Sequence, residues 1–320
     1  GGTGRNQLNK ITRITGIALA FLQGYIYSFA FLGDAGTGIL NIDYLKFALV
    51  LTAGTSLLLW IGDQITAKGI GNGISLIIMA GIISSMPTMF ATAFTELTST
   101  NTFTGVLLFI LYVVVYIAII LGVVYVEGAE RRINVQYANK SNNTFGGKQN
   151  YIPFKLNSSG VMPVIFASAL ISIPSFIASF IKKDGFTNFV NQYLAMDSPV
   201  GFSLYIILIF VFAYFYTFMQ IKPSEMSENL NKNGGYIPGI RPGKETANYI
   251  SDVIGKITIV GALFLAILAG LPVIFGLFSG LSSSVTIGGT GLLIVVGVAL
   301  ETYKQLESQI QSRSYRKGRR

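Results

Sequence analysis

Cysteine and histidine are absent from the 320 residues, and only 12% of the residues are charged. The chain therefore cannot form disulfides, cysteine or histidine metal sites, Ser-His-Asp triads or Cys-His pairs. A soluble domain has about 25% charged residues. This chain is instead 51% hydrophobic, and it begins with Gly1 rather than Met, which indicates a fragment. The composition predicts a polytopic membrane protein that is not an enzyme and carries no cofactor or metal.

Long apolar runs are the main organising feature of the chain. A bilayer core requires about 20 mostly apolar residues per helix. Eight segments meet this requirement, at residues 14–33, 44–61, 74–94, 103–126, 161–181, 200–221, 257–278 and 285–303. The runs are continuous and not alternating, so a membrane barrel is excluded. No signal peptide precedes the first run, and residues 1–13 form an exposed basic segment. The fold class is therefore all-α, a transmembrane helical bundle.

Basic residues are distributed unevenly about these spans. Of the 23 lysines and arginines, all but Lys46, Lys182 and Lys183 fall on one side of the bundle. That side comprises residues 1–13, 62–73, 127–160, 222–256 and 301–320. Positive charge accumulates in the cytoplasm, so we expect a multi-pass protein of the cell membrane with both termini cytoplasmic. The asymmetry accounts for the net charge of +9 without a DNA partner, while a ribosome-facing role stays open.

Acidic residues are missing from the middle of the predicted spans. All 14 lie in loops or near span ends. Ion-coupled transporters keep ionisable groups at mid-membrane, and intramembrane enzymes require a nucleophile, an acid/base pair or a metal. The pattern therefore favours a passive conduit or a receptor-like scaffold.

Two segments next to apolar runs have special backbone chemistry. The sequence GIGNG (residues 69–73) predicts a tight turn and cap before the third span. The fifth span opens NSSGVMPVIFASAL, beginning at Asn157, and Pro163 and Pro174 are expected to break its hydrogen-bond ladder. This is either a plain kinked helix or a helix that must hinge.

The two long loops on the basic side are predicted to be structured. In residues 222–256, a polar helix continues from Pro223 to Asn231, and YIPGIRPG then forms a stiff turn carrying Arg241. That arginine is either a docking residue or part of a plain turn. In residues 127–160, Ile133–Ala138 and Tyr151–Leu156 predict a hairpin. The basic tail RSYRKGRR indicates a membrane-surface anchor.

Four long motifs occur along the chain in the order GIGNGISLIIMAGI, NSSGVMPVIFASAL, NGGYIPGIRPGKET and IGGTGLLIVVGVALETYKQLESQ. Together they resemble the bacterial SecY protein-translocation channel family. The resemblance covers the chain end to end. It implies two inverted halves of five spans each, clamped by a single-helix SecE-like subunit. The spans here resemble the third to the tenth, so the first two spans and the plug are expected to be missing. The implied domains are residues 1–102, residues 103–303 with the two long loops, and the tail 304–320.

The resemblance also implies roles for individual residues. The pore ring would comprise Ile74, Ile78, Ile165 and Ile294. The lateral gate would include Gln23, Asn157, Gly160 and Pro163. From the residues alone, each isoleucine could equally face lipid or a neighbouring helix, and each amide could bond a local carbonyl.

Partners follow from the same resemblance. Arg131, Arg132, Arg241 and Lys244 would face the motor ATPase SecA or a ribosome. SecE-like and SecG-like subunits, signal peptides, translocating polypeptides and membrane lipid are the other implied partners. No P-loop is present, so the energy would come from a partner.

The implied function is the channel subunit of the Sec translocon, a passive conduit for unfolded secretory proteins with lateral release of membrane segments. Three alternatives stay open: an accessory channel of the same type, a solute transporter with discontinuous helices, and a scaffold that recruits partners through residues 222–256. The scaffold alternative predicts that Ile165 and Ile294 tolerate charged substitutions.

Overall fold

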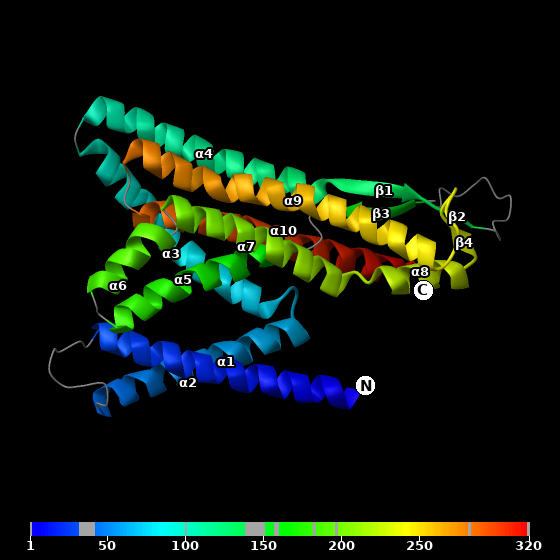
Figure 1. Ribbon diagram of the computed structural model, residues 1–320, viewed down its shortest axis with the longest axis horizontal. Helices are drawn as coiled ribbons and strands as arrows, with labels where there is room; N and C mark the ends of the chain where they lie inside the picture. Colours follow the sequence, from blue (N-terminus) through cyan, green and yellow to red (C-terminus); the bar gives the residue numbers. More distant parts are fainter. Residues whose placement is uncertain are drawn as a thin grey trace. The chain divides into compact units, whose positions relative to one another are not determined.

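The computed structural model describes residues 2–31, 42–99, 101–137, 151–156, 160–181, 184–195, 198–280 and 283–318 (Figure 1). Its helices are α1 (Gly2–Phe31), α2 (Ile42–Lys68), α3 (Gly73–Thr98), α4 (Thr102–Gly128), α5 (Met162–Ile181), α6 (Asp184–Phe189), the π-helical η1 (Val190–Leu194), α7 (Pro199–Gln220), α8 (Pro223–Lys232), α9 (Lys244–Ser279) and α10 (Ser283–Lys317). The strands are β1 (Glu130–Asn134), β2 (Gln136–Tyr137), β3 (Tyr151–Lys155) and β4 (Gly235–Tyr236). The predicted all-α class is confirmed.

Each predicted span overlaps a helix, but α1, α2, α9 and α10 extend well beyond their spans. For example, α9 begins at Lys244, whereas the seventh span was predicted from residue 257. By length and composition, five helical segments of the described chain can cross a membrane. They are Ile42–Lys68, Gly73–Thr98, Thr102–Gly128, Pro199–Lys232 and Lys244–Phe278. The described part of α5 contributes a shorter apolar stretch, Met162–Ala178.

The chain forms two compact units. The first comprises Gly1–Gly81, Leu170–Gly201 and Thr302–Arg320, and the second comprises Ile82–Ala169 and Phe202–Glu301. The division expected from the resemblance, at residues 102 and 303, concerns repeat halves and stays a prediction.

In the first unit, α1 packs against α2 through small and aromatic residues. Gly24 allows close approach, since a Cβ there would lie 3.3 Å from Cβ of Leu51. The rings of Tyr25 and Tyr44 meet edge to face at 6.2 Å. Small residues and aromatic pairs provide the packing that apolar contact alone cannot supply in lipid.

The turn between α2 and α3 is held by side-chain hydrogen bonds. The Asn72 side chain accepts from the backbone N–H of Ile74 at 3.1 Å, and the Thr66 hydroxyl accepts from the N–H of Gly73 at 2.9 Å. Gly71 has φ +85°, a conformation that favours glycine. The predicted tight turn and cap before the third span are confirmed.

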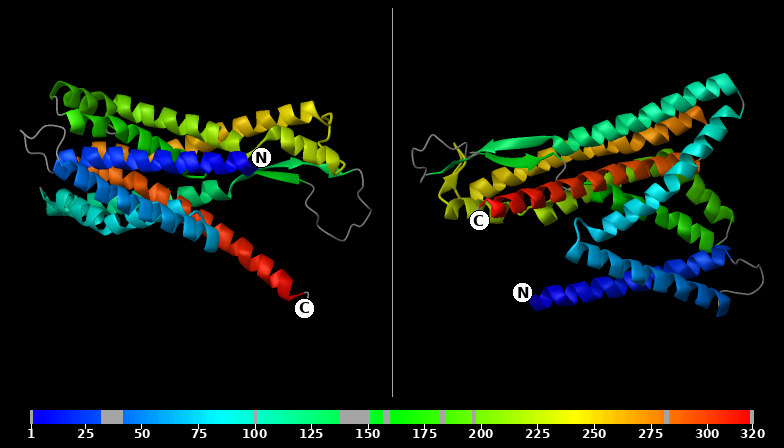
Figure 2. Two further views of the ribbon diagram at one scale, coloured as in Figure 1. Left: turned by 90° about the horizontal axis from the view of Figure 1, so that it is seen from below. Right: turned by 180° about the vertical axis from the view of Figure 1, so that it is seen from behind.

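The second unit is built around α4 and α9, which pack side by side (Figures 1 and 2). Their interface is aromatic: the Tyr112 ring lies 4.6 Å from that of Tyr116 and 5.6 Å from that of Phe275. The Tyr112 hydroxyl donates to the Tyr116 hydroxyl at 3.0 Å, so these phenols are satisfied within the bundle.

The predicted hairpin forms with altered bounds. β1 pairs antiparallel with β3, with Ile133 opposite Ile152 and Glu130 opposite Lys155. The first strand thus begins three residues earlier than expected and ends at Asn134. Beyond it, β2 pairs with β4 of the other long loop. Ile133–Ala138 was therefore wrong as a single strand, because its second half bonds a different partner.

Of two helix predictions, one requires correction. Pro163 does not break the fifth span, because it lies in the first turn of α5, where a missing N–H costs nothing; only Pro174 lies inside the helix. The predicted polar helix from Pro223 to Asn231 is confirmed as α8, which follows α7 after a break. Lys222, with φ −104° and ψ 107°, separates the two helices, and Pro223 starts a new one.

Candidate partner-docking surface and channel residues

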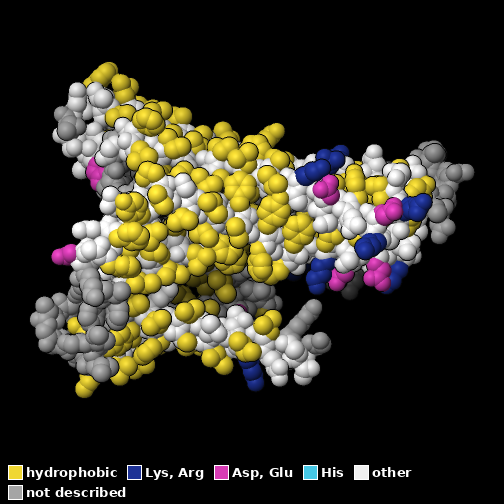
Figure 3. Space-filling model, in the orientation of Figure 1, with side chains coloured by type: hydrophobic (Ala, Val, Ile, Leu, Met, Phe, Trp, Pro, Cys, Tyr) yellow, Lys and Arg dark blue, Asp and Glu magenta, His cyan; other side chains and the backbone are white. Residues whose placement is uncertain are grey.

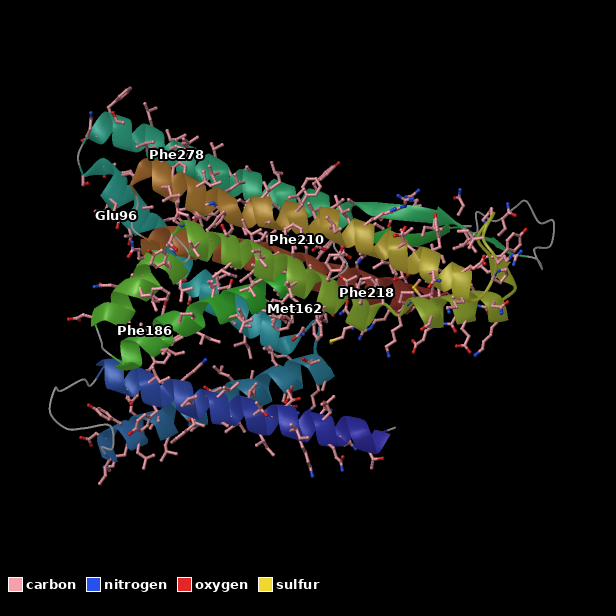
Figure 4. All side chains as sticks on the ribbon, viewed as in Figure 1. Glu96, Met162, Phe186, Phe210, Phe218 and Phe278 are labelled. Carbon is pink, nitrogen blue, oxygen red and sulfur yellow. The ribbon has the colours of Figure 1, made fainter. Side chains whose placement is uncertain are left out.

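The second unit carries a polar module at one end. The module comprises β1–β4, α8, the turn 237–243 and residues 244–257 of α9. Figure 3 shows the contrast: hydrophobic side chains cover the helices, whereas basic and acidic side chains gather at the end formed by the strands and α8. In Figure 4, Phe218 at the end of α7 lies toward this module, and Phe278 lies at the opposite end of α9.

The polar module has a hydrophobic core of its own. The buried members are Ile133, Val135, Phe154, Leu230, Ile237, Ile250, Val253, Ile254 and Ile257. They come from both long loops and from the start of α9. Burial of each large aliphatic side chain is worth about 1.5–3 kcal/mol, so the two loops fold as one body.

The turn that carries Arg241 is fixed by hydrogen bonds. The Thr246 hydroxyl donates to the carbonyl of Arg241, and the Ser227 hydroxyl donates to the carbonyl of Gly243, each at 2.6 Å. The N–H of Ile240 donates to the carbonyl of Ile237 at 3.1 Å. These bonds confirm the predicted stiff turn, and they hold the backbone of Arg241 from both sides.

The side chains of Arg241 and Lys244 are exposed. No ion pair joins either residue to another described residue. Lys244 is moreover the first residue of α9, where the helix dipole disfavours a cation. Neither charge therefore contributes to the stability of the fold by an ion pair.

Arg131 and Arg132 lie on opposite faces of β1, because successive strand residues alternate. Nε of Arg132 donates to the Glu130 carboxylate at 3.0 Å, and its guanidinium carbon lies 4.6 Å from the centre of the Tyr151 ring. The Arg131 side chain is exposed and has no such partner among the described residues. The two arginines were predicted to act as a pair, but only Arg132 makes a hydrogen bond or ring contact with other described side chains, those of Glu130 and Tyr151.

The contact that joins the two long loops was not predicted. β2 pairs with β4, and the Tyr236 hydroxyl donates to Oε1 of Gln136 at 2.9 Å. A Cβ at Gly235 would lie 2.8 Å from the Tyr137 ring, so glycine allows this close approach. Two-residue strands are too short to give a periodic signal in sequence.

The predicted pore residues lie on three helices. Ile74 and Ile78 lie one turn apart on α3 in the first unit, and Ile74 is 45% exposed. In the second unit, Ile165 on α5 is half-buried and Ile294 on α10 is 6% exposed. Each unit thus carries two of the four, and their assembly into one ring stays a prediction.

The predicted gate residues have different environments. Gln23 is exposed on α1 in the first unit. In the second unit, Gly160 and Pro163 are buried at the start of α5, and Gly160 has φ +65°. Asn157 lies outside the described residues, so its expected place at the start of the span is not tested.

Among the described residues, no group of three or more His, Cys, Asp or Glu side chains is arranged to hold a metal ion. Glu96 lies in the last turn of α3, in agreement with the expected placement of acids near helix ends (Figure 4).

Together, the apolar helices and the polar module define a multi-pass α-helical membrane protein with a folded extramembrane surface. A family model described as SecY matches residues 1–303. Proteins named protein translocase subunit SecY from Bacillus licheniformis and Bacillus subtilis are each 44% identical to the chain, over 99% of it and 75% of their own length.

Solved structures show the same fold. One described as a protein conducting channel has TM-score 0.68 at 21% identity, over 95% of this chain and 73% of that chain. Sec61 in a canine ribosome-channel complex has TM-score 0.60 at 20% identity, over 95% of this chain and 73% of that chain. The chain belongs to the SecY family, and its function is that of a channel subunit of a protein translocase.

Proposed function

We propose that this chain forms a passive conduit for unfolded secretory proteins and releases membrane segments laterally into the bilayer. Family membership and the channel fold support the proposal. Apolar helices of the second unit end in a charged, folded module that offers a partner a fixed surface.

The pore ring in this proposal comprises Ile74, Ile78, Ile165 and Ile294. Aliphatic side chains offer no hydrogen bonds, so a narrow gap between them resists wetting and ion passage. The same side chains deform around any polypeptide, because they make no sequence-specific polar contact. An isoleucine ring therefore seals the resting channel without selecting a substrate.

The lateral gate in this proposal uses Gln23, Asn157, Gly160 and Pro163. The amides would contribute interhelical hydrogen bonds, worth about 0.6–2 kcal/mol each in a membrane. Pro174 inside α5 supports a hinge, since its ring removes one ladder bond. The gate opens when a signal sequence inserts beside α5.

Partner docking uses Arg131, Arg132, Arg241 and Lys244, on the cytoplasmic side with both termini. One observation carries this part: the Arg241 backbone is fixed by hydrogen bonds, while its side chain has no ion pair with a described residue. The partner is SecA or a ribosome, and SecE-like and SecG-like subunits complete the complex. The Sec61 structure is itself of a ribosome-channel complex.

The conduit is tested by photocrosslinking from Ile165 to a secretory chain stalled in transit through the complete translocase. We expect an adduct that disappears when the signal sequence is deleted. A probe at Leu121, which is 65% exposed on α4, is the matched lipid-facing control and should give no adduct. Absence of an adduct from Ile165, with the protein inserted and partner-bound, would favour the scaffold alternative.

A further inference from the structure

The start of α5 fits against α10 by a reciprocal match of side-chain size. Gly297 of α10 faces Val161: a Cβ at position 297 would meet the Val161 side chain, with the two Cβ atoms 3.0 Å apart. Glu301 of α10 faces Gly160: a Cβ at position 160 would meet the Glu301 carboxylate, with the carboxyl carbon 3.0 Å away.

In each of the two contacts, a glycine on one segment therefore faces a larger side chain on the other. Gly297 and Glu301 lie four residues apart, on one face of α10. Val161 is 1% exposed, and Gly160 and Gly297 are also buried. We call Gly297 and Glu301 the α10 notch. A buried contact of this kind has one well-packed position, because interiors tolerate neither added bulk nor voids.

The same helix faces carry the proposed pore residues. The N–H of Ile165 donates to the carbonyl of Val161 at 3.1 Å, so Ile165 lies one helical turn after the notch contact. Ile294 precedes Gly297 by three residues and therefore lies on the notch face of α10. A displacement of Val161 from the notch would move Ile165 relative to Ile294.

Electrostatic attraction, like the match of side-chain size, favours the contact between the start of α5 and α10. Glu301 brings a carboxylate to the amino-terminal end of α5, where the helix dipole is positive. Tyr216 of α7 is within electrostatic range of the same carboxylate. The φ of Gly160, +65°, favours glycine, so size and backbone both disfavour a side chain at this position.

We propose that Gly297 and Glu301 are positioning residues that hold the start of α5 in the closed position, and that Val161 must leave the notch when the channel opens. This inference rests on the proposed pore ring, because the consequence of leaving the notch is a change between Ile165 and Ile294. It differs from the gate proposal in naming α10 as the element against which α5 closes.

The first experiment uses the absence of cysteine from the chain. In the complete translocase, Val161→Cys with Gly297→Cys should form a disulfide on oxidation, since the Cβ positions are adjacent. Cysteine is smaller than valine and therefore leaves room for the bulk added at position 297. We expect oxidation to reduce translocation of a secretory protein about tenfold or more, and reduction to restore it.

Each single-cysteine variant, treated with the same oxidant, is the control and should keep its rate. Translocation at the unoxidised rate through the crosslinked channel would overturn the proposal, because the contact would not have to open. Failure of the pair to crosslink in the resting channel would also overturn it.

The second experiment exchanges sizes. Gly297→Val should displace Val161 and raise the export of a substrate without a signal sequence by about tenfold. Adding Val161→Gly should return the export toward its original value. Gly255→Val is the matched control, because the nearest atom to a Cβ there is 3.9 Å away. Equal effects of Gly297→Val and Gly255→Val would overturn the notch.

Ile294→Asn separates this inference from the pore ring. If Ile294→Asn loosens the seal while the size exchange does nothing, the ring stands and the notch fails. If Ile294→Asn has no effect but the disulfide still blocks transport, the ring fails and the notch holds α5 by another route. Glu301→Gln keeps the size and should show only the smaller, electrostatic part of the effect.

Discussion

The membrane helices and the polar module of the second unit expose opposite kinds of side chain. On α4, the phenols of Tyr112 and Tyr116 are buried, whereas Leu107 and Leu121 are 53% and 65% exposed. In the module the aliphatic residues are inside and the charges outside, as Ile250, 0% exposed, illustrates.

The difference follows from the solvent on each side. Hydrocarbon solvates leucine well, so the helices gain nothing by burying it and depend on aromatic packing, close approach and hydrogen bonds. The module meets water, where burial of apolar area is the main stabilising term. The two regions of the chain are therefore stabilised differently. An exposed isoleucine costs little on a lipid-facing helix, whereas in the module its exposure to water is unfavourable.

The largest effect is expected from a charge in the module. Arg241→Glu should lower secretion roughly 30-fold or more while the protein remains folded and inserted, because a central docking arginine contributes about 2 kcal/mol or more. Secretion of a reporter and the abundance of the inserted chain measure this. Lys232→Glu is the matched control, since Lys232 already pairs with Glu228 at 3.6 Å, and it should change secretion less than about twofold. Normal secretion with Arg241→Glu would rule out the docking role.

Substitution of two isoleucines of α9 compares the stability cost of losing an aliphatic side chain in the module and in the membrane. Ile250→Ala should destabilise the module by about 2–4 kcal/mol, because the site is fully buried. Ile259→Ala, at a site 47% exposed, should cost less than about 1 kcal/mol, because lipid solvates the side chain. Hydrogen exchange of residues 221–257 in the membrane-embedded protein measures the first cost, and thermal unfolding the second. Equal costs would contradict the two-solvent account.

A polar side chain in the seal tests the apolar part of the comparison. Ile294→Asn should raise the export of a signal-less substrate about tenfold, because an amide stabilises water in the constriction. The same change at Ile267, which is 52% exposed, is the control and should leave signal dependence unchanged. Strict rejection of signal-less substrates by Ile294→Asn would count against the pore assignment.

A phenol pair measures hydrogen bonding inside the bundle. Tyr112→Phe removes the donor to Tyr116 and should lower stability by about 0.6–2 kcal/mol. Tyr125→Phe, at a site 72% exposed, should change the thermal midpoint little. If both variants have the same midpoint, the buried hydroxyl contributes nothing beyond packing.

The smallest effect distinguishes the two neighbouring arginines of β1. Arg132→Gln loses the Glu130 ion pair and the Tyr151 ring contact, and should destabilise the hairpin by about 0.5–1 kcal/mol. Arg131→Gln should leave hairpin stability unchanged and weaken partner binding instead. Hairpin protection against protease and affinity for the partner separate the two roles, and identical profiles would remove the distinction.

The sequence predicted the helices well because runs of about 20 apolar residues have few alternatives to a spanning helix. It predicted the turn at Arg241 because its prolines and glycines leave few backbone conformations. It missed β4 and wrongly merged β2 with the first strand, since β2 and β4 are defined by a pairing between loops about 100 residues apart. Pro163 was misread because its effect depends on where the helix begins, which a few residues decide.

What the sequence alone determined is therefore the class of the protein: hydropathy, absent cysteine and histidine, uneven basic charge and four ordered motifs lead to a polytopic SecY-family channel. These are properties of composition and local sequence, and membrane insertion and orientation depend on them without tertiary contacts. Only the tertiary structure decided that Arg132 and not Arg131 is engaged by another described residue, that the two long loops share one core, and that Gly297 and Glu301 face Val161 and Gly160. Each of these depends on side chains distant in sequence meeting at a few ångströms, and no periodicity encodes such meetings.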